Sequence, residues 1–524
     1  MRLVIKDYLS QLKEKDELDF LICDLLLQMG YITDNRPETG NRQYGVDIRA
    51  RKGREILLGV IKQGRLNRAN WDSGPNAVRQ SVNEIRDTYI RQMTEDDQKK
   101  QIRIVVITND MMDEAVRIAW DSYVDENAKW GRKNITMEFW NIDKLVDDVQ
   151  KYLFEENLFG AEWQSLLRKA LYFIEESDYR NYYFERIIDG YLSGISTADK
   201  PKIRDKKLAG LYMATQMIAQ YASDAHINKI AIMVTEYLII RYWKYLLEHQ
   251  LFEKKAYTEW LIKFLKAYEK WNEQYYDAVR PCCEDENQLP LYHSVEQRMI
   301  LYEMIGYLTT YAYYQCCKKD RDSWAKGANV YNSVMNLIRN HPQFLYPPYD
   351  EHIGIISMLY RLMDHVGNQN DIRYLMDQQC TRLVMEYRMH KRYPAPSDTF
   401  EEALSIYQNQ ENDYKCSGLW GGMLQWMVLM DQGELYEKCK WNLQEDFKDV
   451  TKCVWFLRAE EELKLYDAYA MNLAGDGTCF EVEDDFESLK KQIQFVREQY
   501  KEESFSYETY SFPALELVDI MGIQ

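Results

Sequence analysis

Along residues 1–155, segments with the hydrophobic spacing of a helix alternate with short apolar runs typical of strands. Apolar residues at helical spacing from Leu18 to Met29 predict a helix that ends at Gly30. Short runs rich in β-branched residues predict strands at 31–33, 44–50, 55–61, 102–108 and 135–140. Amphipathic patterns predict helices at 76–93, 112–128 and 141–154. The resulting order, α-β-β-β-α-β-α-β-α, predicts an α/β unit with a mixed sheet.

The pattern changes from about Glu162 onward, where strand signals fade and long amphipathic segments follow one another. These segments include 165–192, 207–222, 227–250, 257–271, 294–314, 371–390 and 451–474. Helical pairs that recur every 30–45 residues or so favour a stacked α-hairpin array, although an irregular helical domain fits equally well. We therefore predict two domains, 1–158 and an all-α region 159–524. The second could divide again near 281–292 or 341–350, where prolines interrupt the pattern.

The best candidates for chemistry are Asp47 and Lys62, one on each of two neighbouring predicted strands. If these strands pair, the carboxylate and the amine can converge. The helix that precedes them offers two further acids, Glu17 and Asp19, on either side of Leu18. Carboxylates suit Mg²⁺, which prefers oxygen ligands and needs only one or two of them from the protein. A bound cation would polarise a phosphate and activate water, and a lysine would stabilise the charge that develops.

The segments "LDFLICDLLLQMGYIT", "YGVDIRA" and "ILLGVIKQG" resemble the Mrr-type restriction endonuclease branch of the PD-(D/E)XK nuclease superfamily. The resemblance covers about residues 10–155, under a third of the chain. It implies a restriction-endonuclease-like fold and assigns metal-binding acids to Asp47 and to Asp19, with Glu17 as its near neighbour. It also places the catalytic lysine at Lys62 and the metal-facing carbonyl at Ile61. The implied activity is hydrolysis of phosphodiester bonds with Mg²⁺ or Mn²⁺.

One position departs from the family pattern. Val60 stands where the family usually has Glu or Gln, and a valine side chain cannot bind a metal ion. Three nearby residues could supply the missing oxygen: Gln63 if a bulge turns it, and Gln80 or Glu84 from the next helix. The alternative is an inactive domain that binds nucleic acid without cutting it.

Charge is unevenly distributed along the chain. The formal net charge is −18, yet residues 41–70 contain 8 Lys and Arg against 2 Asp and Glu. A basic patch attracts a polyanion even on an acidic protein, because salt screens charges beyond about 10 Å. We expect phosphate contacts from Arg49, Arg51, Lys52, Arg65, Arg68 and Arg79.

Other site types are disfavoured by the sequence. All 7 histidines lie beyond residue 220, no CxxC pair occurs among the 10 cysteines, and no P-loop motif is found. The charged N-terminus and the lack of a long apolar run predict a protein of the cytoplasm without a membrane span.

Taken together, the sequence predicts an Mg²⁺-dependent endonuclease with DNA as the substrate. By analogy with nucleases fused to regulatory domains, it would act as a restrained effector in bacterial antiphage defence. Two other hypotheses stay open: a nuclease-derived module that only binds nucleic acid, and a scaffold whose acidic helical region binds a protein partner or a second copy of the chain.

Overall fold

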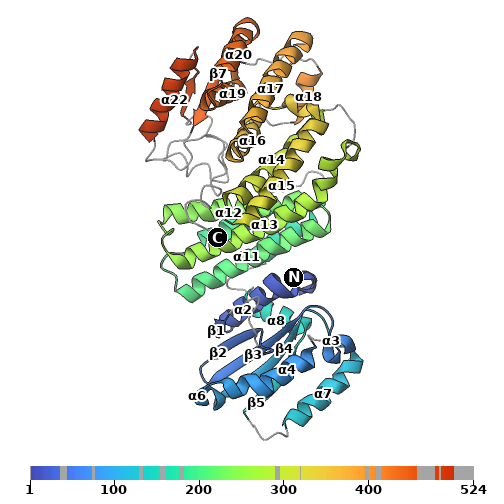
Figure 1. Ribbon diagram of the computed structural model, residues 1–524. Coiled ribbons are helices and arrows are strands. Elements are labelled where there is room, and N and C mark those ends of the chain that lie inside the picture. The colour runs from blue at the N-terminus through green and yellow to red at the C-terminus, as the bar shows by residue number, and fades with distance from the viewer. Residues whose placement is uncertain are drawn as a thin grey trace. The chain divides into compact units, whose positions relative to one another are not determined.

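A computed structural model gives the fold of the chain (Figure 1). It describes residues 2–35, 44–73, 77–128, 134–153, 161–175, 182–289, 295–318, 320–395, 400–408, 415–456, 478–482 and 485–500. The chain divides into two compact units, Met1–Thr235 and Glu236–Gln524. The sheet-bearing part closes at Tyr152, next to the predicted boundary at 158. The first compact unit nevertheless continues through further helices.

The first unit is built on a mixed five-stranded sheet with the order β1-β2-β3-β4-β5. The strands are β1 Ile32–Asn35, β2 Ile48–Lys52, β3 Glu55–Lys62, β4 Gln101–Thr108 and β5 Ile135–Trp140. β2 pairs antiparallel with both β1 and β3, whereas β3, β4 and β5 run parallel. The prediction of an α/β unit with a mixed sheet is therefore confirmed.

Helices cover both faces of this sheet (Figure 1). On one face lie α4 Val78–Glu84 and α7 Glu114–Ala128, separated in the chain by π-helix η2 Ile85–Tyr89, α5 Ile90–Gln92 and α6 Glu95–Gln98. The other face carries α1 Arg2–Gln11, π-helix η1 Glu14–Leu18, α2 Asp19–Gln28 and α8 Ile142–Tyr152. α8 begins as predicted, because the Asn141 side chain accepts a hydrogen bond from the backbone N–H of Lys144 at 2.9 Å. Short α3, Arg68–Asp72, follows β3.

The core between the sheet and α4 and α7 is apolar. Val78 and Val82 of α4 belong to the same buried cluster as Ile104 and Val106 of β4. The ring of Trp71 makes edge contacts with Tyr123, with the ring centroids 5.4 Å apart. This cluster fixes how β3 lies against α4, and β3 carries the residues of interest.

The first unit ends with helices α9 Ala161–Tyr172, α10 Tyr182–Ser193 and α11 Pro201–Asp224, followed by the start of α12 Asn228–Glu248. The segment predicted as one helix at 165–192 is thus two helices, and residues 176–181 lie outside the described part of the chain. α9, α10 and α11 pack against one another, and α11 also contacts α1.

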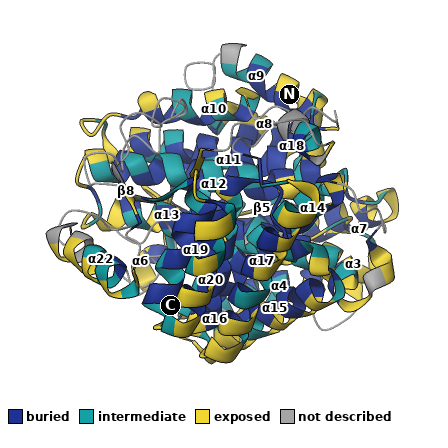
Figure 2. Ribbon diagram, turned by 90° about the horizontal axis from the view of Figure 1, so that it is seen from above, coloured by how far each residue is buried: buried dark blue, intermediate teal, exposed yellow. Residues whose placement is uncertain are grey.

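The second unit is mainly helical. Its helices are α13 Lys255–Glu284, α14 Val295–Cys317, α15 Arg321–Asn340, α16 Ile353–His365, α17 Gln369–His390, α18 Phe400–Tyr407, α19 Gly418–Leu429, α20 Gly433–Asp446 and α22 Phe486–Tyr500. Three short 3-10 helices, Glu286–Gln288, Pro342–Leu345 and Asp350–His352, lie at the two proposed division points. Consecutive helices pack in pairs, α14 with α15 and α16 with α17. Their buried residues recur at helical spacing, as Leu435, Cys439 and Leu443 do on α20. Figure 2 shows buried and exposed residues along the helices.

The helical region differs from the prediction in one respect, because it contains a small sheet of order β6-β7-β8. Its strands are β6 Cys416–Ser417, β7 Thr451–Phe456 and β8 Thr478–Glu481. Residues 451–456 were expected to begin a helix. The run Thr451 to Phe456 is rich in β-branched and aromatic residues, which favour a strand once partners are available on both sides. Residues 457–474 of that expected helix lie outside the described residues.

None of the helices in the described ranges combines the length and the apolar composition that a membrane span requires.

Candidate active site

Asp47 lies directly before β2 and is held by the backbone of β3. Its own N–H donates to the carbonyl oxygen of Gly59 at 2.9 Å, and its Oδ2 accepts from the N–H of Ile61 at 2.7 Å. The sequence predicted Asp47 within the strand, but the regular strand begins only at Ile48. The side chain therefore satisfies a backbone donor of β3 beyond the paired end of β2, and this fixes the carboxylate beside Ile61.

Gly45 explains how the chain reaches this position. It has a φ of +81°, a conformation that L side chains rarely adopt. A Cβ atom at Gly45 would lie 2.3 Å from the backbone oxygen of Ser81 on α4. Only glycine allows the segment before Asp47 to pass this close to α4.

Lys62, the last residue of β3, is paired with an acid that the sequence analysis did not select. Its Nζ lies 3.3 Å from Oε1 of Glu14, while Oε2 of Glu14 accepts from the backbone N–H of Gln63 at 3.2 Å. The lysine side chain is 19% exposed and that of Glu14 35% exposed. Glu14 opens the π-helix η1, an element that occurs often at functional sites. The sequence carried no local signal for this acid, because Glu14 and Lys62 are 48 positions apart.

The two acids predicted on the first helix have different surroundings. Asp19 is buried, with Oδ1 accepting from the N–H of Phe20 at 2.7 Å, and its charge acts on Asp47. Glu17 accepts from the N–H of Lys13 at 2.9 Å. Its charge acts on Tyr8, whose pKa is raised well above the usual value mainly by burial. Of the two, Asp19 is therefore the acid whose effect on Asp47 is evident.

The pKa of Asp47 depends on the charges of three neighbouring side chains. Burial raises the pKa of Asp47 from 3.8 to about 6. The Ile61 N–H and the charge of Lys62 lower it, while the charges of Glu14 and Asp19 raise it further. Asp47, Lys62, Glu14 and Asp19 thus form one charged group at the end of β3, which we call the β3-end cluster.

Asn109 anchors the surroundings of this cluster. It is fully buried just after β4, and its Nδ2 donates to the carbonyl oxygens of Leu9 and Leu12, each at 2.9 Å. Its Oδ1 accepts from the N–H of Gly64 at 2.6 Å. One amide side chain therefore ties the end of α1 to the turn that follows Lys62. The sequence analysis did not select Asn109, because its partners at the end of α1 are about 100 positions away in the chain.

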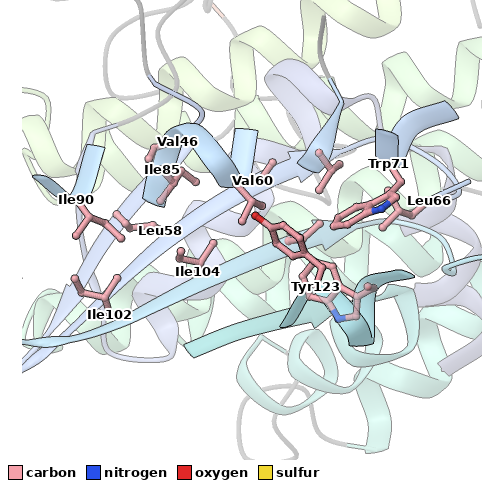
Figure 3. Packing of buried hydrophobic residues seen from close by; sticks show 14 of the residues in the cluster. Val46, Leu58, Val60, Leu66, Trp71, Ile85, Ile90, Ile102, Ile104 and Tyr123 are labelled. Atoms are coloured by element: carbon pink, nitrogen blue, oxygen red, sulfur yellow. The ribbon is translucent and has the colours of Figure 1, made fainter. Parts of the chain in front are cut away.

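Val60 lies in the hydrophobic core and is not placed to bind a metal ion. It is 1% exposed and belongs to the hydrophobic cluster that includes Val46, Leu58 and Ile85 (Figure 3). An acid or amide at this position would be placed in an apolar core. The three residues considered as substitutes, Gln63, Gln80 and Glu84, are all exposed. Of these, Gln63 reaches the β3-end cluster through its backbone N–H.

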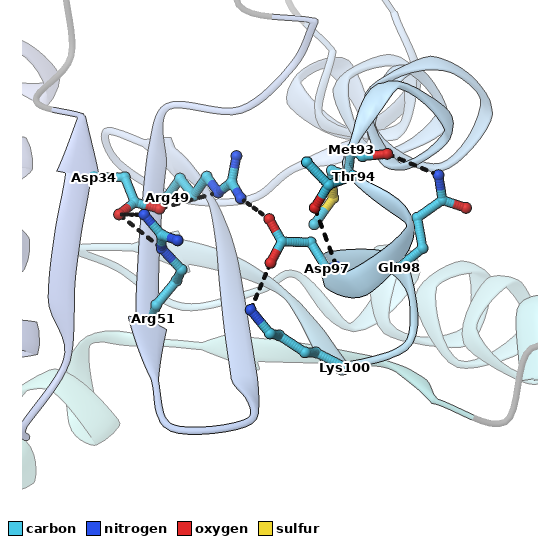
Figure 4. Close-up of polar contacts among 8 residues, drawn as sticks. All are labelled: Asp34, Arg49, Arg51, Met93, Thr94, Asp97, Gln98 and Lys100. Carbon is cyan, nitrogen blue, oxygen red and sulfur yellow. Dashed lines mark hydrogen bonds and ion pairs between the residues drawn. The ribbon is translucent and has the colours of Figure 1, made fainter.

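Two of the predicted phosphate-binding residues are held by acids of the first unit (Figure 4). Arg49 lies 3.1 Å from Asp34 and 2.7 Å from Asp97, which also binds Lys100 at 2.6 Å. Arg51 donates to Asp34 at 2.8 and 2.5 Å. With its side chain 20% exposed, Arg49 contributes to this ion-pair network rather than to an open surface.

The other basic residues are more accessible. Lys52 donates to the carbonyl oxygen of Met29 at 2.8 Å. Arg65, whose side chain is 62% exposed, pairs with Asp113 at 2.6 Å, and Arg79 pairs with Asp72 at 3.1 Å. Arg68 is exposed at the first position of α3. Arg65 and Arg68 follow Lys62 closely in the chain, and both are exposed.

The acids, histidines and cysteines are the side chains most able to bind a metal ion. Within the described residues, no group of three or more such side chains is arranged to hold a metal ion. The β3-end cluster therefore offers carboxylate oxygens without forming a closed cage.

In comparisons with known proteins, no family model, curated protein or solved structure matches the chain.

Proposed function

We propose that the first unit is a metal-dependent endonuclease that hydrolyses phosphodiester bonds, with DNA as its substrate. The observation that carries the proposal is the β3-end cluster. In it, the Asp47 carboxylate is fixed against β3, and the charges of Lys62, Glu14 and Asp19 all act on it. A lysine beside several acids at the end of the central strand provides both of the groups that phosphodiester hydrolysis requires, a site for a cation and a positive charge near the reacting phosphate.

The donor chemistry fits Mg²⁺ or Mn²⁺. Asp47 uses Oδ2 for the Ile61 N–H, which leaves Oδ1 as a hard oxygen ligand. Asp19, whose charge acts on Asp47, would supply the second carboxylate. Mg²⁺ usually keeps several waters and takes only one or two carboxylates from a protein, so these two acids are sufficient. When bound, such a cation would polarise the phosphate and lower the pKa of a coordinated water.

The chain's own residues would do the following. Asp47 binds the cation and is kept in place by the Ile61 N–H. Lys62 directs its ammonium group toward the phosphate, and Glu14 positions that group in the absence of substrate. Arg65 and Arg68 contact neighbouring phosphates and set the register of the duplex. Asn109 keeps the turn after Lys62 close to α1, so the cluster retains its geometry.

The resemblance to Mrr-type PD-(D/E)XK nucleases supports the same assignment, because Gly45-Val46-Asp47 and Lys62 occupy the motif positions of that family. The mixed sheet flanked by helices is the fold that the resemblance implies. We extend the proposal to a restrained effector of antiphage defence, in which the helical region limits cleavage or binds a protein partner or a second copy of the chain.

Plasmid cleavage by the full-length chain tests the proposal. The wild-type protein should cut in Mg²⁺ and not in EDTA, and Asp47→Ala and Lys62→Ala should each reduce the rate by about 100-fold or more. Asp96→Ala and Lys99→Ala, which change exposed residues on and just after α6, are the matched controls and should cut normally. Equal cleavage by all five proteins would overturn the proposal.

A nucleic-acid-binding domain without activity is the second candidate, and the burial of Val60 in the core favours it. In that case the wild-type protein would bind duplex DNA with an affinity that falls steeply with salt, and neither Mg²⁺ nor Mn²⁺ would yield cleavage.

A further inference from the structure

Two cysteines of the second unit lie almost in contact. The Sγ atoms of Cys416 on β6 and Cys453 on β7 are 3.3 Å apart, and no disulfide joins them. Cys416 pairs in register with Thr451, and Thr451 shares a strand face with Cys453 because side chains alternate along a strand. The two thiols therefore lie diagonally on the same face of the small sheet. Cys416 is exposed and Cys453 partly buried.

The backbones that carry these thiols are held firmly. Ser417, next to Cys416, donates to Oδ1 of Asp350 at 2.6 Å, and its Oγ accepts from the N–H of Trp420 at the start of α19. On the other side, α19 presents Gly421 to β7. A Cβ atom at Gly421 would lie only 2.0 Å from the carbonyl oxygen of Cys453. Because the backbone is held on both sides, side-chain rotation would have to bring the two Sγ atoms from 3.3 Å to a bond length of about 2.05 Å.

We propose that Cys416 and Cys453 form a reversible redox site that a hydroperoxide oxidises to an intramolecular disulfide. The exposed Cys416 thiolate attacks one oxygen of hydrogen peroxide, the O–O bond breaks, and the products are a sulfenic acid and water. The Cys453 thiolate then attacks the sulfenic sulfur, the S–O bond breaks, and a second water leaves. The two thiols lose two electrons and two protons in total, and the peroxide takes them up.

A second pair of cysteines in the same unit provides an internal comparison. Cys380 on α17 and Cys439 on α20 have Sγ atoms 3.6 Å apart, but both side chains are buried. The hydrogen bond to Cys439 and the burial raise the pKa of Cys380 well above its usual value. Because oxidation needs an accessible thiolate, the pair on the small sheet should react first.

The proposal does not depend on the nuclease assignment. Oxidation would link β6 to β7 and close a loop between residues 37 apart in sequence, at the point where α19 begins. A cross-link of this kind restricts the unfolded chain and stabilises the fold. The second unit should consequently be more resistant to heat after oxidation.

The test is peptide mapping of the full-length protein after brief treatment with hydrogen peroxide. We expect a Cys416–Cys453 linkage that dithiothreitol reverses and that forms at least about 10-fold faster than a Cys380–Cys439 linkage. Oxidation should also raise the Tm of the wild-type protein by several degrees, and it should leave the Tm of Cys416→Ser unchanged. Cys282→Ser, which changes a partly buried cysteine elsewhere in the unit, is the control and should behave like the wild type.

Three outcomes would overturn the proposal. The first is conversion of Cys416 to a sulfinic acid without a disulfide. The second is a disulfide-linked dimer through Cys416 on a non-reducing gel. The third is oxidation of the buried pair before the pair on the small sheet.

Discussion

The N–H of Ile61 donates a hydrogen bond to Oδ2 of Asp47 at 2.7 Å, and through this bond β3 holds a buried carboxylate whose pKa is about 6. Because this value is above the usual 3.8, the folded protein binds the proton more tightly than the unfolded chain does. The resulting stabilisation is complete below about pH 3.8 and is lost as the pH rises through 6. Above that range, the ionised Asp47 lowers the stability of the metal-free fold.

Asp47→Asn should therefore raise the free energy of unfolding of the metal-free protein at pH 8 by about 1–3 kcal/mol relative to the wild type. This difference between the two proteins should become smaller as the pH falls toward 5, where the wild-type Asp47 is protonated. The asparagine can still accept the bond from Ile61. Thermal unfolding in EDTA at both pH values measures the effect, with Asp96→Asn on exposed α6 as the control. A destabilised Asp47→Asn protein at pH 8 would contradict the buried-charge account.

Glu14→Gln tests the acid that the sequence analysis did not select. The glutamine can keep the bond from the Gln63 N–H but cannot balance the charge of Lys62. We expect the cleavage rate to fall by about 10- to 100-fold, as for residues that orient a catalytic group, with little change in Tm. Glu17→Gln is the matched control. A loss of cleavage in Glu17→Gln and not in Glu14→Gln would reverse the assignment.

Val60→Glu tests whether position 60 can supply a metal ligand. Since Val60 is 1% exposed within the core under α4, we expect a loss of stability of at least about 2 kcal/mol and no gain in cleavage. Chemical denaturation and the plasmid assay measure the two quantities. Ile118→Glu on α7, at a position that is 70% exposed, introduces the same charge and should be tolerated. A stable Val60→Glu protein that cuts faster would show that this side chain does reach the metal.

Arg49 and Arg68 should respond differently to substitution by alanine. Arg68→Ala should weaken binding to duplex DNA and reduce the slope of affinity against salt concentration by about 1, because an exposed phosphate contact is lost. Arg49→Ala breaks the ion pairs with Asp34 and Asp97 and should mainly lower the Tm. Fluorescence anisotropy at several salt concentrations separates the two effects. A change in the salt slope for Arg49→Ala alone would indicate that Arg49 leaves its acidic partners to bind phosphate.

Local patterns predicted most of the first unit. β5 has the predicted bounds, and α8 begins within the predicted range, at the Asn141 cap. β2 pairs with β3, which is the condition under which the sequence predicted that Asp47 and Lys62 could converge. Signals of this kind act over a few residues, so a single sequence is sufficient to reveal them.

Features that depend on distant contacts were not predictable in this way. Glu14 meets Lys62 across 48 positions in sequence, from a π-helical turn that has no recognised pattern. β7 exists because β6 and β8 supply partners, and its own residues also fit the start of a helix. The orientation of Val60 toward the core depends on α4, which covers that face of the sheet. Tertiary packing decides each of these points.

The turn between β2 and β3 consists only of Gly53 and Arg54, with Lys52 opposite Glu55. The hydrogen bond from the Ile61 N–H to Asp47 therefore belongs to a hairpin, which closes within microseconds once its residues have left the ribosome. The last strand of the large sheet ends at Trp140, when most of the chain has yet to be translated. The hairpin that holds Asp47 against β3 would consequently form before any of the second unit, which begins at Glu236, had been translated.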